Sequence, residues 1–144
     1  MEICAYAGSG NVLKVQKMLH KCAEHKTDEK ETLHQSAAVL GVSLISFGEE
    51  TGTEMCMRMM NHLYHYGDHV VKKTVPLAIG LLRVSNPEVT SMDWLSKLAY
   101  ESDSEIAMSA IFSLGLIGAG TNNSKIAQNL RQLASHYSNK TEQD

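Results

Sequence analysis

The sequence predicts an all-α fold, an α-solenoid in which antiparallel helix pairs stack side by side. Three observations support it: a short small-residue segment recurs along the 144 residues, an amphipathic segment follows each copy, and only two prolines occur. Repeats of about 35–40 residues that form helix pairs are typical of such arrays. We expect the array to occupy residues 1–138, as a partial repeat and about three repeats, with a frayed tail at residues 139–144.

The repeat is visible when the copies are aligned. Residues 37–48 (AAVLGVSLISFG) match residues 109–120 (SAIFSLGLIGAG) without a gap, with small and large side chains at the same positions almost throughout. A third copy lies at residues 74–85 (TVPLAIGLLRVS), and a truncated fourth, YAGSGN, at residues 6–11. The small residues that mark the end of each copy, spaced by 38, 37 and 35 positions, are Gly10, Gly48, Ser85 and Gly120.

Each repeat is expected to contain one helix that is apolar nearly all round and a second that is amphipathic. After each small residue, apolar side chains recur every three or four positions, as on one face of a helix. These stripes are Val12, Val15, Leu19 and Cys22; Met55, Met59, Leu63 and Tyr66; Met92, Leu95, Leu98 and Ala99; and Ile126, Leu130, Leu133, Ala134 and Tyr137. The pattern predicts an inner row of buried helices and an outer row that partly faces water.

Polar residues indicate where the first helices end. The segment 20–35 (HKCAEHKTDEKETLHQ) carries charges of both signs and predicts a helix end followed by an exposed loop. Further along, Gly67 and Asp68 are expected to end one helix and start the next.

Capping signals mark the later helices. Pro87 is expected just inside a helix, where its missing N–H costs nothing. Residues 102–105 (SDSE) resemble a capping box before an apolar run. Asn123 or Ser124 can cap the last helix.

The segment 115–123 (GLIGAGTNN) resembles a phosphate-binding loop, because three glycines precede a hydroxyl and two amides. A dinucleotide-binding site requires GxGxxG after a strand, whereas the order here is GxxGxG after residues of helical character. A nucleotide site is usually single, but this feature recurs at four places. We therefore interpret the glycines as packing and turn residues. The predicted positions are Gly10, Gly41, Gly48, Gly80, Gly115, Gly118 and Gly120.

These glycines are expected to act in two ways. Gly118 and Gly120 should let the chain reverse with positive φ. Small residues at Gly41 and Gly115 should let neighbouring helices approach closely. Gly115→Leu is therefore expected to destabilise the fold by crowding.

The histidine-rich segment 61–69 (NHLYHYGDH) is the best candidate for a metal site. His62 and His65 can share a helix face, and His69 could fold back towards them. However, HxxH without a nearby thiolate or glutamate matches no common zinc pattern. Solvent-facing histidines explain the segment equally well, and we predict no metal.

Two further groups are candidates for protein recognition. Among the methionines of residues 55–60, Met55 and Met59 fit the buried stripe, whereas Met57 and Met60 are expected nearer the surface, where they could form a soft binding groove. Acidic residues gather at two turns and could form a strip along one edge of the array. They are Glu49, Glu50 and Glu54 at one turn and Asp103 and Glu105 at the other.

Composition narrows the function classes. The chain is 43% apolar and 20% charged, as folded proteins are, and its net charge of −3 gives no reason to expect nucleic acid. Three cysteines without a CxxC pair favour reduced thiols in a cytosolic or nuclear protein. No apolar run is long enough to cross a membrane. Without a nucleophile elbow, an HExxH motif or a Cys–His signature, we predict no catalytic residue, no cofactor and no enzyme activity.

The repeated blocks also resemble a known family. Together with YAGSGNVLKVQKMLH, VPLAIGLLRVSNPEV and IFSLGLIGAGTNNSKIAQNLRQLA, they resemble the proteasome/cyclosome repeats of the large non-ATPase scaffold subunits of the proteasome regulatory particle, over about residues 3–137. The resemblance implies a fragment of a repeat toroid that docks on the ATPase ring and receives ubiquitin, ubiquitin-like domains of shuttle factors and a deubiquitinase, without catalysis, in cytoplasm and nucleus. Family members often carry a long charged insertion where this chain has the short segment 23–35.

The resemblance identifies no residue of this chain as a ubiquitin contact. Taken out of a ring, the fragment should expose apolar end faces and self-associate. A generic helical-repeat adaptor outside the proteasome is the alternative, and a nucleotide- or metal-dependent helical enzyme is a more distant one.

Overall fold

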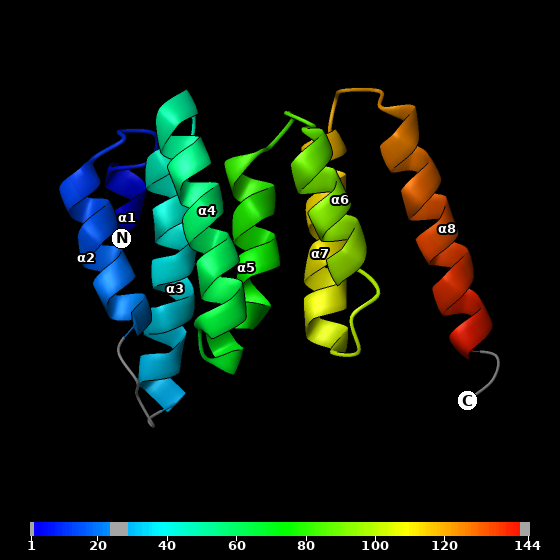
Figure 1. Ribbon diagram of the computed structural model, residues 1–144, viewed down its shortest axis with the longest axis horizontal. Helices are drawn as coiled ribbons and strands as arrows, with labels where there is room; N and C mark the ends of the chain where they lie inside the picture. The colour runs from blue at the N-terminus through cyan, green and yellow to red at the C-terminus, as the bar shows by residue number, and fades with distance from the viewer. Residues whose placement is uncertain (1, 24–28, 142–144) are drawn as a thin grey trace.

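The computed structural model describes residues 2–23 and 29–141, and every regular element in them is an α-helix (Figure 1). The helices are α1 (Glu2–Ala5), α2 (Val12–Ala23), α3 (Glu29–Ser46), α4 (Glu50–Tyr66), α5 (His69–Leu82), α6 (Val89–Leu98), α7 (Ser104–Gly118) and α8 (Ser124–Thr141). The predicted all-α array of helix pairs is confirmed.

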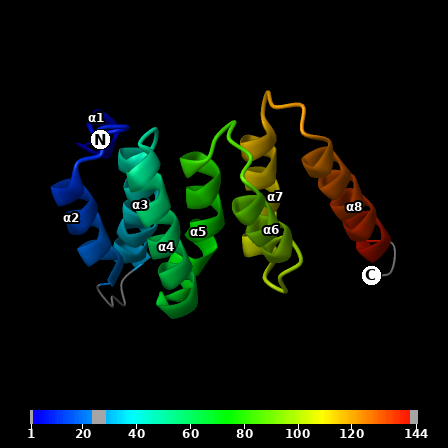
Figure 2. The same ribbon diagram turned by 45° about the horizontal axis from the view of Figure 1, so that its top comes forward.

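The helices stand side by side in two rows. Helices α3, α5 and α7 pack against one another in sequence and form the inner row, while α2, α4, α6 and α8 form the outer row. In Figure 1 the outer helices α4 and α6 lie in front of the inner row, and Figure 2 shows the same arrangement from another direction. Each outer helix packs mainly against the inner helix that follows or precedes it, α4 against α5 and α6 against α7.

The core lies between the rows. Its largest fully buried side chains come mostly from the inner helices and include Ile45, Ile79, Leu114 and Ile117. The outer helices each bury one face, as Leu95 does on α6. Burying one such side chain contributes about 1.5–3 kcal/mol. The predicted division into a buried inner row and a half-exposed outer row is therefore confirmed.

The buried face of α4 differs from the predicted one. Met60 is fully buried, whereas Met55 is 53% exposed, and Cys56 rather than Met59 belongs to the core. Apolar residues fill five of the six positions from 55 to 60, so two stripes with helical spacing are available. Packing against α3 and α5 selects the stripe that contains Cys56 and Met60, and the prediction for Met55 and Met60 is wrong.

The first helix boundaries differ from the predictions in one place. Helix α3 already begins at Glu29, so residues 29–35 (EKETLHQ) are helical where a loop was predicted. This segment has no glycine or proline and consists mostly of good helix formers. Residues 24–28 lie outside the described residues. Gly67 and Asp68 separate α4 from α5 as predicted.

Three later helix boundaries also differ from the predictions. Pro87 lies two residues before α6 rather than inside its first turn, and Glu88 is the N-cap residue. Asp103, not Ser102, caps α7: its carboxylate accepts a hydrogen bond of 3.0 Å from the backbone N–H of Glu105. The last helix reaches Thr141, so the segment expected as a tail from residue 139 starts within α8, and residues 142–144 lie outside the described residues.

Candidate functional site

The residues that end each sequence copy all form left-handed turns. The φ angles are 61° at Gly10, 84° at Gly48, 55° at Ser85 and 72° at Gly120. Positive φ is readily adopted by glycine and disfavoured for other residues. The same backbone conformation therefore follows every inner helix, as the repeat requires.

These turns also link neighbouring repeats. The backbone N–H of Gly10 donates to the carbonyl of Ile45 at 2.9 Å, and that of Ser85 donates to the carbonyl of Leu116 at 3.2 Å. Both acceptors lie in the last turn of the next inner helix, where carbonyl groups lack an intrahelical partner. The Gly10 and Ser85 turns thus each cap the inner helix of the following repeat.

The polar groups of the segment 115–123 (GLIGAGTNN) form hydrogen bonds within the chain. The Asn123 side chain accepts hydrogen bonds from the backbone N–H groups of Lys125 at 3.0 Å and Ile126 at 3.3 Å, and so caps α8. The Thr121 hydroxyl donates to the carbonyl of Gly118 at 2.9 Å. The groups that resembled a phosphate site therefore form a helix–turn–helix connection.

At Gly80 two inner helices approach each other closely. A Cβ atom built on it would lie 2.7 Å from Cβ of Ser113 on α7. At Gly118 it would lie 3.0 Å from Cγ2 of Ile126. Gly41 is buried within α3. Close packing, rather than chain reversal, is the role of Gly118, which ends α7 without a positive φ.

Gly115 does not have the predicted role within this chain. A Cβ atom built on it meets nothing within 4 Å among the described residues, so no helix crowds it. It lies on the face of α7 directed away from α5, together with Met108 and Phe112, which are 63% and 61% exposed. Since α7 is the last inner helix, this face has no inner neighbour to cover it in the described part of the chain.

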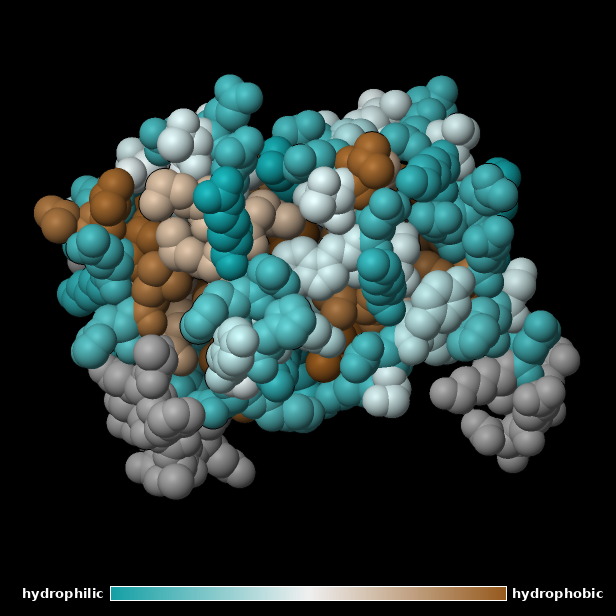
Figure 3. All heavy atoms as spheres, viewed as in Figure 1, coloured by the Kyte–Doolittle hydropathy of each residue, from teal (hydrophilic) through white to brown (hydrophobic). Residues whose placement is uncertain are grey.

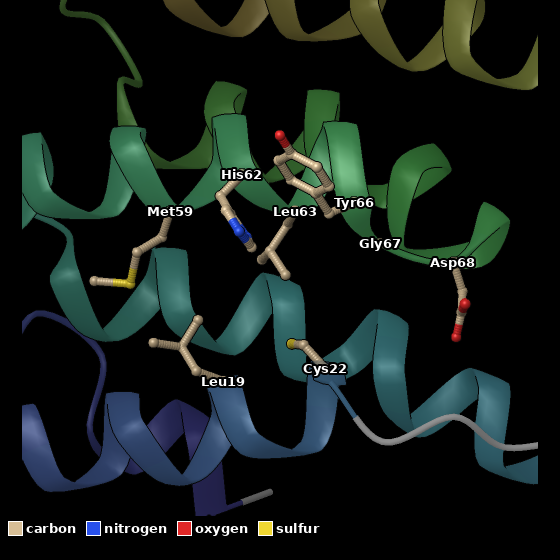
Figure 4. A pocket seen from close by; sticks show the side chains of 8 residues that line it. All are labelled: Leu19, Cys22, Met59, His62, Leu63, Tyr66, Gly67 and Asp68. Carbon is tan, nitrogen blue, oxygen red and sulfur yellow. The ribbon is translucent and has the colours of Figure 1, made fainter.

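A groove separates α2 from α4 on the outer row (Figure 4). Its volume is about 410 Å³, and Leu19 and Cys22 of α2 face Met59 and Leu63 of α4 across it. The stripe that was predicted to be core in α4 therefore faces α2. Burial raises the pKa of the Cys22 thiol to about 11, so the group stays protonated at neutral pH and is a poor nucleophile.

A larger groove, of about 850 Å³, lies between α4 and α6 and is called the α4/α6 groove below. Tyr64 of α4 and Trp94 of α6 meet in it as a T-shaped pair with ring centroids 6.3 Å apart. The residues lining it are Met57, Arg58, Asn61, Tyr64, His65, Val89, Thr90, Asp93, Trp94, Lys97, Leu98 and Glu101. Of the two methionines expected in a binding groove, Met57 lines this one, whereas Met60 is buried in the core. The sequence did not predict the position or the other lining residues of either groove, because they depend on the spacing of helices far apart in the chain.

The space between α6 and α8 is bridged by polar contacts. The Asn129 amide donates to the Ser96 hydroxyl at 3.1 Å, and the Tyr137 hydroxyl donates to the carbonyl of Ala99 at 2.7 Å. Figure 3 shows that apolar side chains are visible between polar ridges on this face of the molecule. In the outer row, the α2/α4 and α4/α6 intervals are therefore open grooves, whereas the α6/α8 interval is bridged by hydrogen bonds.

The histidines of residues 61–69 have separate neighbours. Nδ1 of His65 lies 2.8 Å from the carbonyl of Asn61, and the His62 ring lies against Tyr66 with centroids 4.8 Å apart. His69 forms an ion pair of 3.0 Å with Asp103. Among the described residues, no group of three or more His, Cys, Asp or Glu side chains could hold a metal ion.

The two acidic turns do not form one strip. Glu49 and Glu50 follow α3, whereas Asp103 and Glu105 begin α7, and inner helices run in the same direction, so the turns lie at opposite ends of the array. The latter pair is also engaged, because Lys73 contacts the Glu105 carboxylate at 2.8 Å. The hydrogen bond from the Glu105 N–H, followed by the charges of Lys73 and His69, lowers the pKa of Asp103 despite some desolvation.

Comparison with known proteins agrees with this repeat architecture. Residues 109–143, which contain the last two thirds of α7, the Gly120 turn and α8, match the proteasome/cyclosome repeat family. Over 134 residues the chain is 55% identical to 26S proteasome non-ATPase regulatory subunit 2 homolog A of Arabidopsis thaliana, covering 93% of this chain and 15% of the relative. The chain is a proteasome/cyclosome repeat protein.

Two further relatives are also named as proteasome regulatory subunits. This proteasome/cyclosome repeat protein is 54% identical over 137 residues to 26S proteasome non-ATPase regulatory subunit 2 of Dictyostelium discoideum, covering 95% of the chain and 15% of the relative. It is 49% identical over 140 residues to 26S proteasome regulatory subunit rpn1 of Schizosaccharomyces pombe, covering 95% of the chain and 16% of the relative. The chain therefore spans about one sixth of the length of these relatives. No helix in the described ranges is both long and apolar enough for a membrane span.

Proposed function

We propose that the chain is a non-catalytic scaffold and protein-recognition segment of the 26S proteasome regulatory particle. The observation that carries the proposal is the turn–helix link between repeats, in which Gly10 and Ser85 cap the inner helices of the next repeat. This link holds the turn before α2 against the end of α3 and the turn before α6 against the end of α7. It is combined with 49–55% identity to relatives named as proteasome regulatory subunits.

The scaffold works because its surface is ordered before a partner arrives. The inner row supplies a continuous apolar core, and the outer helices present side chains on one face. A rigid array loses little conformational entropy on binding, so more of the contact energy appears as affinity. No step of this role requires a nucleophile, a cofactor or a metal.

The proposed partners are proteins. They are the other subunits of the proteasome base, including the ATPase ring, and ubiquitin, ubiquitin-like shuttle factors or a deubiquitinase, in cytoplasm and nucleus. A net charge of −3 disfavours a nucleic-acid partner. The names of the relatives describe them as non-ATPase or regulatory subunits, which supports a role without catalysis.

A chimera tests the scaffold role. In the S. pombe relative, the matching segment is replaced by this chain, and proteasomes are purified through another base subunit. We expect the chimera to co-purify in normal amounts, and a second chimera carrying Gly80→Leu to be depleted because its repeats cannot pack. A chimera that is folded and abundant but absent from proteasomes would support the adaptor alternative.

A titration tests the recognition role separately. The labelled chain is followed residue by residue by NMR while ubiquitin or a ubiquitin-like domain is added. Saturable shifts confined to one patch of the outer row are expected if this segment receives these proteins. If no shift occurs, ubiquitin recognition belongs to other repeats of the longer relatives, and this segment is a structural part of the scaffold.

A further inference from the structure

The α4/α6 groove differs from its neighbour between α6 and α8. Hydrogen bonds from Asn129 and Tyr137 close the α6/α8 interval, whereas an aromatic pair, Tyr64 and Trp94, lies within the α4/α6 groove. Both rings are only half-buried, and Val89 beside them is 60% exposed. The groove therefore offers aromatic and aliphatic surface that a partner can cover.

Charges on the two walls of this groove are not balanced. Asp93 is already paired with Lys125 at 3.1 Å. Arg58 on α4 and Lys97 on α6 are exposed and form no ion pair within the part of the chain that the structure describes. Each wall thus carries a cation that is available to a ligand.

The end of the groove near Glu101 has the opposite character. Burial raises the pKa of the Tyr64 hydroxyl, and the negative charges of Glu101 and Asp103 raise it further. A ligand carboxylate is repelled near Glu101 and attracted towards Arg58, which lies six residues before Tyr64 on α4. The charge pattern thereby sets where the acidic part of a ligand can lie.

We propose that the α4/α6 groove binds an acidic peptide segment of a partner protein, with a leucine or aromatic anchor on Trp94 and carboxylates near Arg58 and Lys97. Anchors that fill an aromatic-lined groove supply most of the affinity, and complementary charges supply selectivity and encounter rate. The inference rests on the proposed recognition role and names the class of partner for one surface of it.

The chain carries its own reporter for this test, because Trp94 is its single tryptophan and lies in the groove. The probe is a short synthetic peptide in which leucine and phenylalanine alternate with aspartate and glutamate. The comparison peptide has lysine in place of every acidic residue. We expect the acidic peptide to change Trp94 emission saturably and the basic peptide to bind much more weakly.

Charge reversal within the α4/α6 groove tests whether the acidic peptide binds there. Arg58→Glu combined with Lys97→Glu should weaken the acidic peptide by about tenfold or more, since two favourable charge contacts become repulsive. The same variant should bind the basic peptide better than the unmodified chain does. Lys21→Glu combined with Arg131→Glu is the matched control, because it changes net charge equally at exposed sites outside the groove. Circular dichroism establishes that both variants fold.

Several results would overturn the proposal. They are the absence of a saturable change, equal binding of both peptides, and equal weakening by the control variant. Trp94 emission that depends on protein concentration alone would show that a second copy occupies the groove. None of these results bears on the chimera, so the peptide inference can fail while the scaffold role stands.

Discussion

Gly80 and Gly115 occupy the same position of two successive repeats, yet their surroundings are opposite. Gly80 on α5 lies against Ser113 on α7, where a built Cβ atom would come within 2.7 Å of Ser113 Cβ. Gly115 on α7 faces open space among the described residues. An identical residue in an identical helical context is thus a packing requirement in one repeat and has no such role in the other, because the neighbour supplies the constraint.

Substitution of Gly80 should have the largest effect. Gly80→Leu forces α5 and α7 apart, since the nearest atoms include the Ser113 backbone, and we expect a loss of about 3 kcal/mol in unfolding free energy. Urea denaturation followed by circular dichroism measures it.

Gly115→Leu is the matched control for that change. On the open face it should be neutral or stabilise by up to about 1 kcal/mol, because leucine favours helix over glycine. This expectation replaces the destabilisation by crowding that the sequence predicted for Gly115→Leu. Equal losses of unfolding free energy for Gly80→Leu and Gly115→Leu would contradict the difference between the packed face of α5 and the open face of α7.

The open face of α7 should drive self-association. Met108 and Phe112 are both more than 60% exposed there, and burying one such side chain against a second copy contributes about 1.5–3 kcal/mol. Phe112→Glu should therefore weaken association by about tenfold or more. Sedimentation velocity over a concentration series measures it.

Val89→Glu, on the outer row with similar exposure, is the control for self-association. It should leave the association constant unchanged. A chain that is strictly monomeric at all concentrations would contradict the prediction, and a larger effect of Val89→Glu would move the contact to the outer row.

The turns offer a smaller contrast. Ser85 adopts φ of 55° and Gly120 adopts 72°, so only one of the two has the residue suited to a left-handed turn. Ser85→Gly should be neutral or stabilise by roughly 0.5 kcal/mol, as relief of strain exceeds the entropy that glycine adds to the unfolded chain. Gly120→Ala should cost about 1 kcal/mol. Thermal unfolding distinguishes the signs, and the same sign for both changes would contradict the assignment.

The smallest expected effect comes from Asp103, which caps α7 and contacts His69 and Lys73 of α5. Its pKa is lowered in the folded chain from the ordinary value of 3.8. Its contribution to stability is therefore present above that value and is lost as the pH falls through the lowered pKa. Asp103→Asn should flatten the decline of melting temperature with acid in this window. Glu54→Gln, an exposed residue outside the contact, should leave the slope unchanged.

Several features of the fold followed from local sequence. Small residues at a regular spacing predicted where the four turns lie, including the one at Ser85, and the left-handed conformation was predicted correctly at Gly120, because the conformation of a tight turn depends on a few neighbouring residues. The start of α8 at Asn123 followed for the same reason, since an N-cap bonds to its own first turn. The division into inner and outer helices followed from how completely each helix is apolar.

Other features of the fold depend on contacts with neighbouring helices. Apolar residues fill five of the six positions from 55 to 60, so the sequence allowed two buried faces of α4, and packing against α3 and α5 chose one. Pro76 lies within α5, where it is fully buried, although proline usually interrupts a helix. Burial of the surrounding α5 residues between α3 and α7 offsets that cost.

By itself the sequence determined the class of fold, the repeat, its turns and the absence of a nucleotide-binding pattern, because these depend on residues close together in the chain. Only the tertiary structure decided which glycines are crowded, which methionines are buried and where grooves open between outer helices. Those properties depend on distances between residues about one repeat apart, and such distances are set by how whole helices pack.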